Sequence, residues 1–111
     1  MLTRLIMWRW PLVAVLVSGP SMVPTLRSGD AIVVWRGARV RPGDVVLARF
    51  LSLPDRLVVK RAVRLAPGGW WIEGDNELVT DDSRRYGPAE VIGRVVCRYW
   101  PPAHAGRVRR R

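Results

Sequence analysis

Short apolar runs alternate with turns that contain glycine and proline along most of the chain. Turn residues at 41–44 and 67–69 separate such runs, and none carries the 3.6-residue period of a long helix. Short runs between turn signals are typical of β-strands. The predicted strands are residues 12–17, 31–35, 45–50, 57–65, 70–73 and 91–100. The pattern therefore predicts an all-β fold, a compact barrel or sandwich of about six to eight short strands.

The segment that leads into the first predicted strand is apolar but interrupted. Arg9 and Pro11 break the run over residues 5–17, so its continuous part is far shorter than the roughly 20 apolar residues that span a membrane. A spanning anchor is therefore not expected, whereas Trp8 and Trp10 would allow peripheral contact with a membrane surface. A cleaved secretory signal is disfavoured, because cleavage would remove the start of the motif described below.

Length and composition indicate one domain. The chain has 111 residues, of which 49% are apolar, enough for a single modest core. We expect an N-terminal arm at residues 1–10, one domain over residues 11–102 and a basic tail at residues 103–111. Residues 74–88 are polar and are expected to form a loop.

The chain is strongly basic, with a formal charge of +10 from 19 basic and 9 acidic residues. Such a charge is typical of nucleic-acid-binding proteins, but the arginines are scattered except in the run at 107–111, which is expected to be a solvated, mobile end. A non-catalytic β-barrel that binds nucleic acid is therefore a less favoured alternative. Cys97 is the only cysteine, which excludes an internal disulfide and a cysteine-rich zinc site. No cofactor or metal is predicted.

Only one lysine is present, Lys60, and its surroundings are apolar. In a strand, Lys60 shares a face with Val58 and Ala62, and burial among such residues lowers the pKa of an amine. A neutral lysine can act as the base that activates a serine hydroxyl. The single histidine, His104, lies beside the basic tail and is poorly placed for that role. The alternative is a lysine with a buried stem and an amine that reaches water.

A rigid corner in the sequence presents a serine. Residues 18–26 read SGPSMVPTL and are followed by RSGD. An apolar strand leads into this stretch, and Pro20 and Pro24 restrict the backbone on both sides of Ser21. Taken alone, the stretch is also compatible with a plain β-turn rich in serine and proline.

Three segments together resemble the signal peptidase I family of Ser/Lys endopeptidases. SMVPTL at 21–26, followed by GD, resembles the nucleophile box of this family. VVKRAV at 58–63 resembles its lysine box, and GDNELVTDDSR at 74–84 resembles its third box. The boxes occur in the order of the family, and the resemblance covers about residues 12–100. It implies a signal-peptidase/LexA-like catalytic core and a serine endopeptidase activity.

The resemblance also implies a role for individual residues. Ser21 matches the nucleophile, Lys60 the general base, and Thr80 a hydroxyl that orients the lysine amine. The supporting residues are an ion pair beside the lysine with a serine between its members, and the loop that supports the base: Asp82, Arg84, Ser83, Gly74, Asp75 and Asn76. The backbone N–H of Ser21 would donate to the oxyanion. The residues assigned to the oxyanion site and substrate groove are Gly19, Pro20, Met22 and Pro24.

Two points of this assignment stay open. Some family members supply a second oxyanion donor from a serine at the position of Gly19, and Ser18 lies one position too early to replace it. Met22 either packs inward or lines the groove.

The implied substrate is a protein with an N-terminal extension. The run PGGWWIEGDN at 67–76 and the ending RYWPP at 98–102 resemble nickel-type superoxide dismutase maturation proteases, which trim the dismutase precursor. The alternative substrate is a secretory preprotein, cleaved at the membrane by a true signal peptidase. The first reading implies a cytoplasmic location, and membrane association belongs to the second. A self-cleaving repressor-like domain, which also uses Ser and Lys, ranks lower, because no DNA-reading domain precedes Ser21.

Overall fold

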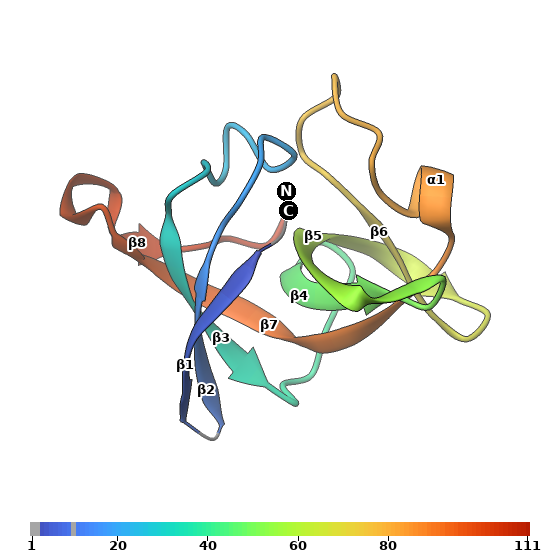
Figure 1. Ribbon diagram of the computed structural model, residues 1–111, viewed down its shortest axis with the longest axis horizontal. Coiled ribbons are helices and arrows are strands. Elements are labelled where there is room, and N and C mark those ends of the chain that lie inside the picture. Colours follow the sequence, from blue (N-terminus) through green and yellow to red (C-terminus); the bar gives the residue numbers. More distant parts are fainter. Residues whose placement is uncertain (1–2, 10) are drawn as a thin grey trace.

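The fold is a single antiparallel sheet that curls upon itself. The computed structural model describes residues 3–9 and 11–111. The strands lie in the order β1-β2-β3-β7-β4-β5-β6, and β8 pairs with β7 (Figure 1). Their bounds are Arg4–Arg9 (β1), Leu12–Leu16 (β2), Ala31–Arg36 (β3), Val45–Phe50 (β4), Leu53–Ala66 (β5), Gly69–Glu73 (β6), Ala89–Trp100 (β7) and Gly106–Arg107 (β8). The predicted all-β fold is confirmed.

Two apolar clusters form the core, and strands β4 and β5 contribute to both. Val45 and Leu47 of β4 belong to the first cluster, while Val46 and Ala48 belong to the second. Successive side chains of a strand leave opposite faces of the sheet, so β4 is buried on both faces. This explains why it reads as a continuous apolar run. On β5, Val59 faces the first cluster and Val58 faces the second.

The predicted strands are present, and the main differences lie at their ends. Strand β5 begins at Leu53 rather than at Leu57, because a tight turn at 51–52 lets Leu53 pair with Phe50 of β4. The predicted loop at 74–88 contains a one-turn helix, α1 (Ser83–Tyr86), and Asp82 caps its first turn by accepting a hydrogen bond from the Arg84 N–H. A short 3-10 helix, η1 (Pro102–His104), follows β7.

The N-terminal arm is also a strand. Residues 4–9 form β1, which pairs antiparallel with β2. The predicted membrane contact of Trp8 and Trp10 rests on side chains that lie outside the part of the chain described by the structure.

The basic tail is mostly exposed to solvent, as predicted, and it also contacts the body of the domain. Arg107 pairs with Cys97 of β7, and Val108 packs against the first apolar cluster. Arg110 and Arg111 form ion pairs with Asp44 and Asp75. The carboxylates sit on two loops that the fold brings beside the tail, which the local sequence of the tail does not reveal.

Within residues 3–9 and 11–111, no helix combines the length and apolar character needed to cross a membrane.

Candidate active site

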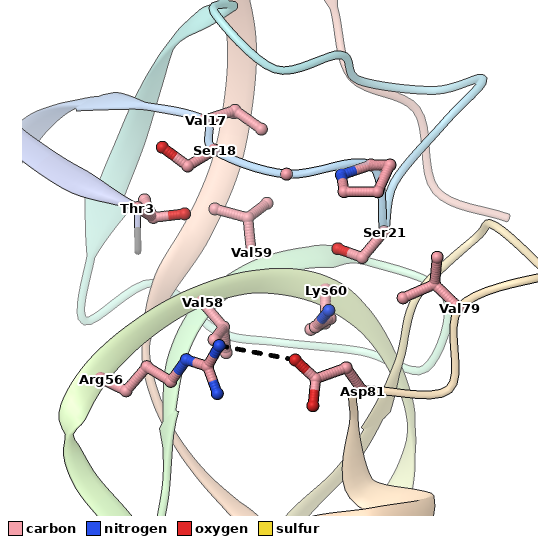
Figure 2. A pocket seen from close by; sticks show the side chains of 12 residues that line it. Thr3, Val17, Ser18, Ser21, Arg56, Val58, Val59, Lys60, Val79 and Asp81 are labelled. Atoms are coloured by element: carbon pink, nitrogen blue, oxygen red, sulfur yellow. Dashed lines mark ion pairs between the residues drawn. The ribbon is translucent and has the colours of Figure 1, made fainter. Parts of the chain in front are cut away.

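Ser21 and Lys60 line the same pocket. This small pocket, of about 60 Å³, lies between the loop that follows β2, one face of β5 and the segment before α1 (Figure 2). In Figure 2 the Ser21 hydroxyl and the Lys60 amine both face this space. The remaining lining residues are Thr3, Val17, Ser18, Gly19, Pro20, Arg56, Val58, Val59, Val79 and Asp81. The fold therefore brings together a hydroxyl and an amine that are far apart in the sequence.

The Gly-Asp-Asn segment holds the backbone of Ser21. The Asn76 N–H donates to the Ser21 carbonyl at 2.9 Å, and the Asn76 side-chain amide donates to the Pro20 carbonyl at 3.0 Å. Gly74 allows this close approach, because a Cβ at that position would lie 2.5 Å from the Ser21 carbonyl oxygen. The two segments are therefore fitted to each other at the backbone.

Apolar anchors and a glycine shape the rest of the loop that carries Ser21. Met22 and Leu26 are fully buried in the first apolar cluster, so Met22 packs inward. Gly19 has a φ of 87°, a left-handed conformation that favours glycine, and it lines the pocket. Pro20 also lines the pocket, whereas Pro24 is exposed on the far part of the loop.

Lys60 is buried where the sheet is most apolar. It pairs with Val46 across β4 and β5, and only 4% of the residue is exposed. Burial lowers the pKa of the Lys60 amine from its ordinary value of 10.5, while the negative charges of Asp82 and Asp81 act in the opposite direction. The net shift favours the neutral amine, the form that can accept a proton.

An ion-paired network ties the loop that carries Ser21 to β5. Arg61 follows Lys60 on the strand and points to the opposite face, where its guanidinium forms a two-pronged pair with Asp75. Thr25 of the Ser21 loop donates its hydroxyl proton to the same carboxylate. Burial alone would raise the pKa of Asp75, but these hydrogen bonds and the charges of Arg61 and Arg111 lower it overall. Asp75 is therefore a charged anchor between the loop and the strand.

A second carboxylate fixes the segment that follows the Gly-Asp-Asn loop. Asp82 is fully buried and pairs with Arg84 at 2.7 Å. It also accepts a hydrogen bond from the Gly74 N–H at 3.0 Å. Burial opposes ionisation of Asp82, yet these bonds and the Arg84 charge lower its pKa overall. Ser83 accepts a hydrogen bond from the Ile72 N–H at 2.8 Å, which joins α1 to β6.

The hydroxyl residues Thr80 and Ser18 are placed differently from Ser21 relative to the pocket. Thr80 is exposed and does not line the pocket, although its neighbours Val79 and Asp81 do. Ser18 lines the pocket, but Figure 2 shows its hydroxyl directed away from that of Ser21.

The sequence analysis missed two charged residues of the pocket, Arg56 and Asp81. They form an ion pair at 3.5 Å near Lys60 (Figure 2). The period of two along β5 places Arg56 and Val58 on the same face as Lys60, so that signal could have found Arg56. Asp81 lies in an irregular segment, where no periodic signal applies.

Comparison with known proteins identifies the class of this chain. Residues 9–96 match the Peptidase S24-like family, and the chain belongs to that family. It is 34% identical to the mitochondrial ATP-independent inner membrane protease subunit 1a of Arabidopsis thaliana, over 84% of this chain and 73% of the plant protein. It is 31% identical to the mitochondrial inner membrane protease subunit 1 of Homo sapiens, over 86% and 74% of the two chains. Subunit 2 of the corresponding protease of Schizosaccharomyces pombe is 26% identical.

Proposed function

We propose that the protein is a serine endopeptidase in which Ser21 is the nucleophile and Lys60 the general base. One observation carries this proposal: the Ser21 hydroxyl and a buried lysine whose pKa is lowered share one pocket. Membership of a peptidase family supports it. Hydroxyl nucleophiles need an adjacent base, and within the described residues Lys60 is the only amine that lines the pocket.

The reaction would proceed through an acyl-enzyme. Neutral Lys60 takes the proton of the Ser21 hydroxyl as Oγ attacks the scissile carbonyl carbon. The Ser21 N–H donates to the oxyanion, and the Asn76 and Gly74 contacts hold that backbone in place. Lys60 then returns the proton to the leaving amine. A water molecule gives a proton to Lys60 as it attacks the ester carbonyl, and Lys60 passes that proton to the Ser21 Oγ as the acyl bond breaks and the product acid leaves.

The proposed role of Thr80, to orient the Lys60 amine, requires a change on substrate binding. Thr80 is exposed in the free protein, so its hydroxyl would have to turn toward the pocket when a substrate covers the segment. Catalytic hydrogen bonds are often long or unformed before substrate binds.

We further propose that the substrate is a preprotein from which an N-terminal leader is removed at a membrane. The relatives are inner membrane proteases by name, which favours this reading over the nickel superoxide dismutase precursor predicted from the sequence. The chemistry is the same in both cases, because each reaction hydrolyses one peptide bond.

Intact-mass spectrometry tests the activity and the substrate together. A secretory preprotein in detergent and a nickel superoxide dismutase precursor are each incubated with the protein, with Ser21→Ala as the blank. We expect a single cleavage that releases the leader of the preprotein. Cleavage of the dismutase precursor alone would overturn the substrate proposal, and equal cleavage by Ser21→Ala would overturn the nucleophile.

A further inference from the structure

A second and larger opening lies where β4 and β7 separate. The pairing of these strands ends with Val46 and Arg94, and the C-terminal segment crosses the gap beyond it. This segment leaves β8 and returns toward the middle of the molecule, where the Arg111 N–H donates to the Gly43 carbonyl at 3.0 Å (Figure 1). The opening, which we call the arginine fork, measures about 570 Å³. Its charged lining residues are Asp44, Arg94, Arg107, Arg109 and Arg110.

The arginine fork carries a large excess of positive charge. Of the described residues that line it, Asp44 is the only carboxylate, and it already accepts hydrogen bonds from the Arg41 N–H and the Arg110 guanidinium. In the part of the chain that the structure describes, the guanidinium groups of the other three arginines have no ion-pair partner. Clustered guanidinium groups present a fork of N–H donors that matches phosphate oxygens. The excess of positive charge therefore favours an anion with a phosphate group as the ligand.

The remaining lining of the arginine fork is aliphatic. It consists of Val45, Val95, Val96 and Val108, and among the described residues no aromatic side chain lines the opening. Sites for single-stranded nucleic acid stack bases on aromatic rings, which this lining does not offer. Valine side chains beside guanidinium groups suit an anion that carries an aliphatic part.

Exposed apolar side chains continue from the arginine fork across the sheet. Trp35 lies directly opposite Arg94 in the β3–β7 pairing, and Leu12 lies opposite Trp35 in the β2–β3 pairing. Residues paired in this way leave the sheet on the same face. Trp35 is 46% exposed and Leu12 is 44% exposed. Tryptophan and arginine side by side are characteristic of surfaces that lie at a membrane interface.

We propose that the arginine fork binds the phosphate group of an anionic phospholipid and holds this face of the protein against a membrane. The guanidinium groups contact the phosphate, and the two partly exposed valines of the lining, Val96 and Val108, contact the glycerol region. Trp35 and Leu12 enter the interface beside Arg94. Free phosphate offers the same oxygens without the aliphatic part, so the experiment separates the two sources. This binding does not depend on the proposed peptidase activity.

Vesicle co-sedimentation at several salt concentrations tests the proposal. One set of vesicles is phosphatidylcholine alone, and the other is an equimolar mixture with phosphatidylglycerol. The test variant is the double substitution Arg107→Gln with Arg109→Gln, whose side chains are exposed and bind no other described residue. The matched control is Arg39→Gln with Arg64→Gln, which removes the same charge from exposed positions outside the arginine fork. Inorganic phosphate and a single-stranded oligonucleotide are titrated in parallel.

The wild-type protein is expected to sediment with the anionic vesicles only. The arginine fork variant should bind them about 10- to 30-fold more weakly, and the control variant should lose less than about threefold. Equal losses in both variants would show a general charge effect and overturn the proposal. Phosphate binding without vesicle binding would overturn the lipid as the source of the anion. Arginine fork-dependent binding of the oligonucleotide alone would overturn the proposal in favour of nucleic acid.

Discussion

Ser21 and Lys60 meet in one pocket, but the chain holds them there by different means. Ser21 lies on a loop whose backbone is held by hydrogen bonds from Asn76 and by the close approach of Gly74. Lys60 lies in the middle of a strand that is packed on both faces by apolar side chains. The position of Ser21 thus depends on polar contacts made far along the sequence. The position of Lys60 depends on the sheet itself.

The largest expected effect is on catalysis, when either partner is removed. Ser21→Ala and Lys60→Met should each lower the rate of cleavage by at least about a thousandfold, because the nucleophile and its base act as a unit. Cleavage of the preferred substrate, followed by intact mass, measures this loss. A loss of less than about tenfold in either purified variant would contradict the proposed pair.

The same two variants should differ in stability. Ser21→Ala should leave the free energy of unfolding nearly unchanged, whereas Lys60→Met should raise it at neutral pH by removing an amine whose burial is unfavourable. Because the folded-state pKa of Lys60 is lowered, the unfolded chain binds an extra proton between that pKa and 10.5. Stability of the wild type should therefore rise with pH through this window, and the difference from Lys60→Met should shrink. Denaturant melts at several pH values check this trend.

Gly74→Ala should displace the loop that carries Ser21. Its Cβ would collide with the Ser21 carbonyl oxygen and displace the nucleophile, which we expect to cost about a hundredfold in kcat/KM. The matched control is Gly69→Ala, whose Cβ would collide with the Ala89 carbonyl, away from the pocket. Both variants should lose stability, but only Gly74→Ala should lose activity in the fraction that remains folded. Equal activity losses would show that Gly74 acts through stability alone.

Asp81→Asn should shift the pH dependence of cleavage through its effect on Lys60. The negative charge of Asp81 favours the protonated Lys60 amine, so its removal should lower the pKa of Lys60 further. Activity requires the neutral amine, so the acidic limb of the kcat/KM profile should move to lower pH. Glu90→Gln, which removes an exposed carboxylate outside the pocket, is the control and should leave the limb in place. If the acidic limb of the kcat/KM profile stays in place in Asp81→Asn, the charge of Asp81 does not act on Lys60.

The smallest expected effect concerns Thr80. If its hydroxyl turns toward Lys60 in the substrate complex, Thr80→Val should lower kcat several-fold, while Thr80→Ser should stay near the wild-type value. Single-turnover rates of the two variants provide the comparison. Identical rates would remove Thr80 from the mechanism and leave Asp81 as the polar neighbour of the base on this segment.

The strands and the burial of Lys60 could be predicted because their signals are local. The run at 45–50 lies between turns and matches β4 at both ends, and the alternation around Lys60 places Val58 and Ala62 beside it. The assignment of a nucleophile to the loop that carries Ser21 came from a resemblance to a family, since periodicity says little about an irregular segment.

Contacts between distant segments could not be predicted in this way. The basic tail reads as a solvated end, yet Arg110 and Arg111 bind carboxylates that the fold brings to the same side of the molecule. Asp81 enters the pocket through the path of an irregular segment, and Arg61 is buried because Asp75 reaches it from another loop. Such pairs depend on the tertiary arrangement, which short-range patterns do not encode.

Two neighbouring positions on β5 act on opposite sides of the site. Lys60 faces the pocket, while Arg61 pairs with Asp75. Asp75 in turn binds Thr25 of the loop that carries Ser21. The strand therefore positions Lys60 directly and, through Arg61 and Asp75, the loop that carries Ser21. The far end of β5 has no such role, because the turn at residues 67–68 does not line the pocket. A protein module inserted at this hairpin turn would therefore extend the molecule and leave the alignment of the Ser21 hydroxyl and the Lys60 amine intact.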